Sequence, residues 1–159
     1  MSYNLQKKDK GFTIIEVVLV LAIAGLIFLM VFIALPALQR GQRDTQRKND
    51  LSRVLTSIQN YQTNNRGALP TNYADFTTKY LVAGSDKFND PSTGDIYTFF
   101  DQSGDIRVLP TEPVSKPDNS KIFYYNKASC EGETIVASGG NKVAFAMKLE
   151  GGGIACQSN

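Results

Sequence analysis

The chain has no histidine and no tryptophan, and only two cysteines among its 159 residues. Catalytic triads that use histidine as the base, and metal sites that use it as a ligand, are therefore excluded. A thiol nucleophile would also need a base of this kind. The Asn-x-Ser/Thr pattern that accepts N-linked glycans is absent as well.

Excess charge of one sign and enzyme motifs are missing too. The formal net charge is only +2, so composition does not indicate a nucleic-acid partner. The basic side chains outside the first ten residues are neither contiguous nor interleaved with aromatics in a recognisable motif. No nucleophile elbow, phosphate-binding loop or metal-ligand spacing occurs. The sequence predicts that the protein is not an enzyme and has no resident cofactor.

One long apolar run dominates what is present. Residues 17–38 contain no charged side chain, and as a helix they cover about 33 Å, enough to cross the hydrocarbon core of a membrane. Lys7, Lys8 and Lys10 precede the run and are expected to stay cytoplasmic. This predicts a single membrane span with the amino terminus inside and everything after residue 38 outside.

The residues at the start of this run carry a family resemblance. Gly11, Phe12 and Glu16 stand in the segment Gly-Phe-Thr-Ile-Ile-Glu-Val, after a basic leader and before the apolar run. This arrangement resembles the processing site of type IV prepilins. The resemblance implies that prepilin peptidase removes the leader 1–11, that Phe12 becomes the methylated first residue, and that Glu16 is the fifth residue of the mature chain.

Glu16 is costly in an apolar segment, by on the order of a few kcal/mol, unless it has a partner or lies hydrated at the interface. The resemblance implies an assembly role for it, together with the new amino group of Phe12. Gly25 matches a helix-loosening glycine of the family, whereas Pro36 lies about one turn later than the family's proline. Proline removes a backbone donor, which predicts a kink near Leu35.

Residues 39–66 are predicted to continue as an amphipathic helix. Leu51, Val54, Leu55, Ile58 and Tyr61 recur at the spacing of one helix face. A left-handed cap supplied by Asn65 and Gly67 is expected to end the helix. The resemblance to pilins extends from Lys7 to about Pro70.

The first half of this helix carries charges of both signs. Two interpretations stay open for them: a solvated face, with Arg40 and Arg43 meeting phospholipid head groups, or pairing between neighbouring chains of a filament. The residues concerned are Arg40, Arg43, Arg47, Lys48 and Arg53, set against Asp44 and Asp50.

Beyond the helix the sequence predicts turns and short elements. A short helix is expected within 73–82, and a hairpin through the turn 101–105 is expected to join strands 96–100 and 106–109. Further strands are expected at 122–125, 134–137 and 143–149. An antiparallel sheet of three to five strands packed on the helix around residues 51–61 gives an α+β fold, and the resemblance implies the type IV pilin fold.

Cys130 and Cys156 lie outside the membrane in the predicted topology. An even pair in an oxidising compartment is most simply a disulfide, with two free thiols as the alternative. The resemblance implies a disulfide that bounds a carboxyl-terminal surface loop, within a region 67–159 that also holds the αβ-loop and the sheet.

Acidic residues between 86 and 105 raise the question of calcium, which takes six to eight oxygen ligands. Asp90, Asp95, Asp101 and Asp105 are the weak candidates, because their spacing fits no EF-hand and aspartate is also common in turns. Residues 88–97 resemble a loop of the major pseudopilins of type II secretion, some of which bind calcium. A late disulfide is less expected in those proteins.

The resemblance implies a structural pilin: a single-pass inner-membrane precursor that contacts the pilus assembly platform and polymerises through residues 12–38 into an extracellular filament of identical chains. Twitching motility, adhesion and DNA uptake are the functions expected of such a filament. The alternatives are a minor pilin, a secretion or competence pseudopilin, or a membrane-anchored module that binds DNA, a surface ligand or a secreted substrate.

Overall fold

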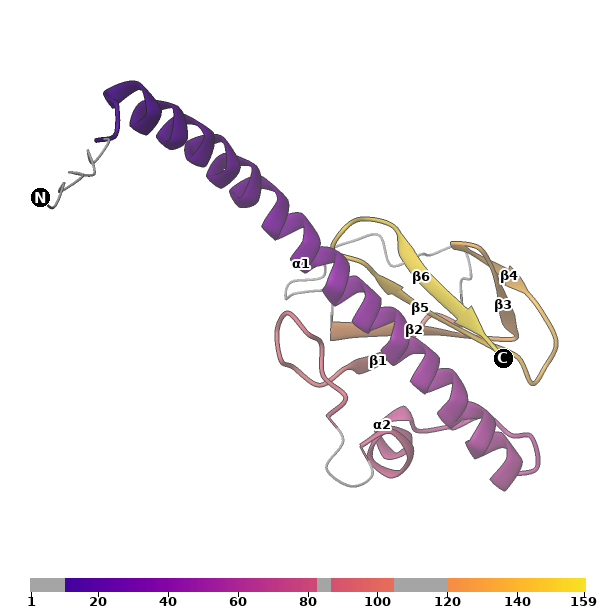
Figure 1. The fold of residues 1–159 in the computed structure, drawn as a ribbon. Helices are drawn as coiled ribbons and strands as arrows, with labels where there is room; N and C mark the ends of the chain where they lie inside the picture. The colour runs from indigo at the N-terminus through magenta and orange to yellow at the C-terminus, as the bar shows by residue number, and fades with distance from the viewer. Residues whose placement is uncertain (1–10, 83–86, 105–119) are drawn as a thin grey trace, which may run out of the picture. The chain divides into compact units, whose positions relative to one another are not determined.

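A computed structural model describes residues 11–82, 87–104 and 120–159 of the chain. The element order is one long helix, a short helical segment and six short strands. The chain divides into two compact units, Met1–Leu38 and Gln39–Asn159, and each is described by itself. Figure 1 shows the elements in sequence colours.

The long helix α1 runs from Ile14 to Asn64 and keeps its helical assignment through Pro36. The kink expected near Leu35 is not measured and stays a prediction. Within residues 11–40 every side chain is exposed except that of Ala24, which is intermediate. Because these residues are mostly apolar, exposing so large a surface to water is unfavourable. An exposed apolar surface of this size indicates contact with a membrane or with another protein.

The end of α1 differs in detail from the predicted cap. The backbone N–H of Gly67 donates to the carbonyl of Gln62 over 2.7 Å, as in a helix terminated by left-handed residues. Arg66 and Gly67, with φ of 56° and 82°, take this conformation. Asn65 instead donates its side-chain amide to the Tyr61 carbonyl, so the prediction was right for Gly67 and wrong for Asn65.

The predicted short helix within 73–82 is confirmed. The α2 helix covers Tyr73–Phe76 and continues into a π-helical turn, Thr77–Leu81. The side chain of Asn72 caps its start by accepting from the backbone N–H groups of Ala74 and Asp75.

The sheet of the second unit has the strand order β1-β2-β5-β6. Its strands are β1 (Thr98–Asp101), β2 (Lys121–Asn126), β5 (Val143–Lys148) and β6 (Ile154–Ser158). The β2–β5 and β5–β6 pairs are antiparallel, with Tyr124 opposite Phe145 and Ala146 opposite Cys156. A second, two-stranded sheet is the hairpin β3 (Ala128–Glu131) and β4 (Thr134–Ala137).

The parallel pairing of the first strand was not predicted, and the predicted hairpin stays untested. β1 pairs with β2 in parallel, Thr98 opposite Lys121, whereas the sequence predicted a hairpin between 96–100 and 106–109. A parallel pair needs a long connection, and the stretch from 102 to 120 supplies enough chain. The predicted partner strand 106–109 lies outside the described residues. The α+β layout with a sheet that is mostly antiparallel is confirmed.

The core explains why the helix and the hairpin cover opposite faces of the sheet. Val143, Phe145 and Met147 share one cluster with Leu51, Val54 and Ile58 of α1. Ala144 and Ala146 belong to a second cluster with Ala128 and Ile135 of the hairpin. Since alternate residues of a strand point to opposite faces, α1 covers one face and the β3–β4 hairpin the other.

Candidate functional site

The start of α1 is built around Glu16. Its Oε2 accepts from the backbone N–H of Thr13 over 2.9 Å and from the Thr13 hydroxyl over 2.6 Å. Thr13 directly precedes the helix, so the two residues form a capping box that satisfies an otherwise unpaired N–H. The pattern Thr-x-x-Glu at 13–16 is the sequence signature of this motif, so the local partner of Glu16 could have been predicted.

The residues predicted around Glu16 are placed without further contacts. Phe12 is 90% exposed, and Gly11 precedes the helix with nothing near its Cα. Gly25 lies inside α1, also with open space beside it. Lys7, Lys8 and Lys10 lie outside the described residues. The amino-terminal apolar segment is therefore exposed, and its one carboxylate, that of Glu16, is held by hydrogen bonds to Thr13.

Further along α1, a buried ion cluster connects three segments of the chain. It consists of Arg43, Asp44, Arg47, Asp90 and Glu150. The Arg47 side chain has no exposed surface. It donates to Asp44 over 2.8 Å, to Asp90 over 2.7 Å and to Glu150 over 2.9 Å. Arg43 reaches the same Glu150 carboxylate over 2.7 Å. The three partners come from the helix, from the loop before β1 and from the β5–β6 turn.

Asp44 joins the β5–β6 turn to the helix through backbone groups. Its carboxylate accepts from the N–H of Glu150 and of Gly151, each over 2.8 Å. A Cβ added at Gly151 would come within 3.0 Å of the Asp44 carboxylate, so a residue without a side chain suits this close approach.

The electrostatics of the cluster follow from burial and from these bonds. Burial raises the pKa of Asp90, but hydrogen bonds from Arg47, Ser92 and Thr93 outweigh it and hold that pKa below its usual range. Bonds from Arg43, and then from Arg47, lower the pKa of Glu150. Burial opposes the charge of Arg47, yet its bonds to Asp90 and Glu150 raise its pKa. All three groups therefore stay ionised at neutral pH.

A second buried contact continues this cluster along the helix. The Tyr97 hydroxyl donates to the Asp50 carboxylate over 3.1 Å, and Arg53 lies 3.5 Å from the same carboxylate. Burial raises the pKa of Asp50 despite these partners. The loop before β1 is thus attached to α1 at two successive points.

The interpretation of these charges from the sequence was wrong for Arg43 and Arg47. They do not form a fully solvated face, because they pair with Asp90 and Glu150 of the same globular unit. The physical reason is helical periodicity: positions 44 and 47 continue the stripe of Leu51, Val54 and Ile58 backwards. Arg40 and Lys48 remain exposed.

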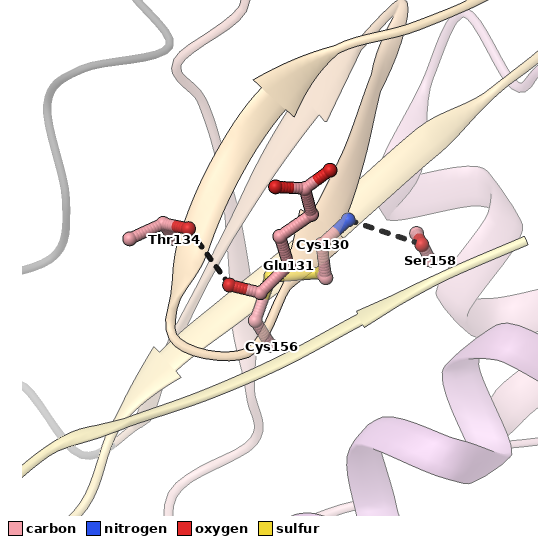
Figure 2. The surroundings of a disulfide bond; sticks show 5 residues. All are labelled: Cys130, Glu131, Thr134, Cys156 and Ser158. Carbon is pink, nitrogen blue, oxygen red and sulfur yellow. Dashed lines mark hydrogen bonds between the residues drawn. A yellow bond between two sulfur atoms is a disulfide. The ribbon is translucent and has the colours of Figure 1, made fainter.

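The predicted disulfide is confirmed. Cys130 of β3 and Cys156 of β6 are joined, with Cα atoms 5.8 Å apart, and Figure 2 shows the surroundings of this bond. The Cys130 backbone N–H also donates to the Ser158 hydroxyl over 3.2 Å. The disulfide therefore fixes the hairpin to the last strand of the main sheet.

The calcium candidates do not converge where they are described. Asp90 belongs to the buried ion cluster, while Asp95 and Asp101 are exposed and Asp105 lies outside the described residues. Within residues 11–82, 87–104 and 120–159, no three acidic or cysteine side chains gather closely enough to hold a metal ion. Calcium binding stays a prediction.

One helix in the described part of the chain, α1, is long and apolar enough to cross a membrane by length and composition. This fits a membrane-anchored precursor.

Comparison with known proteins gives one match. Residues 6–32 match the family model for the prokaryotic N-terminal methylation motif, the class III signal of type IV pilins. No curated protein matches the chain, and no solved structure does. The motif implies processing by prepilin peptidase and assembly into a pilus. The chain thus carries the class III signal of type IV pilins together with a pilin-type α+β layout. These two features support a pilin-like or pseudopilin-like precursor. The motif points to a structural subunit rather than an enzyme.

Proposed function

We propose that the protein is a structural subunit of a type IV pilus, used for motility, adhesion or DNA uptake. Prepilin peptidase cuts the inner-membrane precursor between Gly11 and Phe12, and the mature chains polymerise into an extracellular filament. The observation that supports this most strongly is the exposed apolar surface of residues 12–38, next to the methylation motif. Lipid covers this surface in the precursor, and neighbouring helices cover it in the filament.

The driving force for replacing lipid by neighbouring helices is close packing of side chains, and not the removal of apolar surface from water. Because lipid tails are as apolar as these side chains, helix association in a membrane depends on close packing and on polar contacts. Glu16 supplies a polar contact. Once cleavage frees the amino group of Phe12, this group, from the same chain or from an adjacent one, becomes the counter-charge for Glu16 and sets the register of the incoming subunit.

The carboxyl-terminal disulfide favours a pilin over a major pseudopilin. It stabilises a surface hairpin, and this is the arrangement that the resemblance to pilins implies. A minor pilin or a membrane-anchored binding module differs from a major pilin in abundance, so the share of the chain in purified filaments separates these roles.

The substitution Glu16→Ala tests the proposal. The expected result is at least a tenfold loss of the protein from sheared surface fibres, with normal amounts in the membrane and an intact Cys130–Cys156 bond. Asp75→Ala, which removes an exposed carboxylate outside the apolar segment, is the control and should assemble. A Glu16→Ala chain that forms fibres like the wild type would overturn the role of the carboxylate.

A further inference from the structure

Two groups of exposed charged side chains stand out in the described part of the unit Gln39–Asn159. The acidic tip is the β3–β4 turn with Glu131 and Glu133. The basic end consists of Arg66, Lys127 and Lys142. All five side chains are exposed, and within the described part of the chain none of them forms an ion pair with a side chain of opposite charge.

The acidic tip is held firmly. Glu131 pairs with Thr134 across the hairpin, and its carbonyl accepts from the Thr134 hydroxyl over 2.7 Å. The preceding residue, Cys130, is fixed by the disulfide to Cys156. Figure 2 shows the Glu131 carboxylate directed away from the carbonyl that accepts this bond. The two glutamates are thus presented on a turn whose backbone is held by these contacts.

The two groups lie at opposite ends of the globular part of α1. Glu133 lies beside the β5–β6 turn, because a Cβ added at Gly153 would come within 2.8 Å of its Oε1, and this turn is bound to Asp44. At the other end, the Lys127 N–H donates to the Lys142 carbonyl, and Gln62 donates to Asn141 over 2.9 Å. Positions 44 and 62 are separated by about 27 Å of helix, and along β3 Lys127 and Glu131 are about 13 Å apart.

Other charges near each end do not cancel this polarity. Lys148 is half-buried near the acidic tip and Arg40 is exposed near Asp44, but neither forms an ion pair with Glu131 or Glu133. At the basic end the Lys142 amino group already donates to the terminal backbone oxygen of Asn159 over 2.7 Å, so the positive charge there comes mainly from Arg66 and Lys127. Asp75 and Lys79, of opposite charge, line one shallow pocket beside Tyr61.

We propose that the acidic tip of one subunit binds the basic end of a second copy of this chain. The inference rests on the proposed filament and names a contact between its globular units. Opposite charges at opposite ends suit a heterologous, head-to-tail contact, which produces an open helical assembly instead of a closed dimer. Such rim charges set orientation and association rate, and salt weakens them.

Charge reversal tests this contact in cells that make filaments of the full chain. The double variant Glu131→Lys with Glu133→Lys is expected to lower the yield of sheared fibres at least tenfold. Adding Arg66→Glu and Lys127→Glu to the same chain reverses both ends, and the yield should return to within about threefold of the wild type. Asp95→Lys with Asp101→Lys, at two exposed carboxylates outside both groups, is the control with the same change in net charge, and it should assemble normally.

Membrane abundance and formation of the Cys130–Cys156 bond report whether each variant folds. If the double reversal does not fold, Glu131→Gln with Glu133→Gln takes its place, with an expected threefold or greater loss of fibres. Fibre yield equal to that of the control, or a loss that the fourfold variant does not restore, would overturn this contact. A wild-type chain that forms no fibres would instead overturn the proposed function.

Discussion

The two halves of α1 differ in both polarity and burial. Residues 14–38 are uncharged after Glu16, and their side chains are exposed almost throughout. Residues 39–64 carry many charges, yet Asp44, Arg47 and Asp50 are buried together with Leu51 and Val54. Polarity therefore does not decide which half is buried in the monomer. The second half is covered by its own chain, whereas the apolar side chains of the first half are left exposed.

Removal of a buried charge from the second half should have the largest effect on the free energy of unfolding. Arg47→Ala leaves the carboxylates of Asp44, Asp90 and Glu150 without their shared partner, and breaking a buried ion pair in this way costs about 3 to 5 kcal/mol. The free energy of unfolding should fall by that amount. Urea unfolding of the full chain in detergent measures it, followed by tyrosine fluorescence because tryptophan is absent.

The matched control is Arg40→Ala, two helical turns earlier on the exposed part of the same helix. This variant should unfold at the urea concentration of the wild type. Equal destabilisation by the two substitutions would mean that burial of Arg47 does not distinguish the two arginines in solution.

Acid should produce a smaller loss from the same cluster. The pKa values of Asp90 and Glu150 are lowered in the folded state, so their stabilisation is present above their ordinary values near 4 and is lost as pH falls through the lowered ones. Asp50 acts in the opposite sense, since its raised pKa makes the folded state the better proton acceptor.

Urea midpoints measured between about pH 6 and pH 3 should therefore decrease for the wild type. The decrease should be steeper for Asp50→Asn, which removes the opposing group, and shallower for Glu150→Gln. A midpoint that stays constant over this range would show that the cluster is not ionised as described.

The smallest expected effect comes from removing one methyl group from either half of α1. Ile58 has no exposed surface, whereas Ile27 is 59% exposed. Ile58→Val should lower the free energy of unfolding by about 1 kcal/mol, and Ile27→Val should leave it unchanged. If Ile27→Val also destabilised the globular unit, the two halves would not be independent in the way the structure indicates.

The sequence predicted the parts of the fold that depend on local pattern. The apolar run, the stripe of Leu51, Val54 and Ile58, and the strand at 134–137 were all confirmed, because periodicity and β-branched residues report directly on local structure. The strand β3 was missed because Ala-Ser-Cys-Glu has little β-propensity. The strand β6 was missed because it is short and follows a run of three glycines.

Contacts between distant segments were less predictable. The parallel pairing of β1 with β2 depends on a long connection, which local pattern does not show. Asp90 and Glu150 were not identifiable as partners of Arg47, since they lie 43 and 103 residues away in the sequence. The burial of Arg47 itself was readable, because the apolar stripe of α1 points back to positions 47 and 44.

The most direct test of the account is the intact mass and amino-terminal sequence of the protein sheared from the surface of cells that express it. The account predicts a chain that starts at N-methylated Phe12 and lacks the two thiol hydrogens of Cys130 and Cys156. A chain that keeps its leader and is found only in the membrane would contradict the filament proposal and leave a single-pass anchor that displays a binding domain.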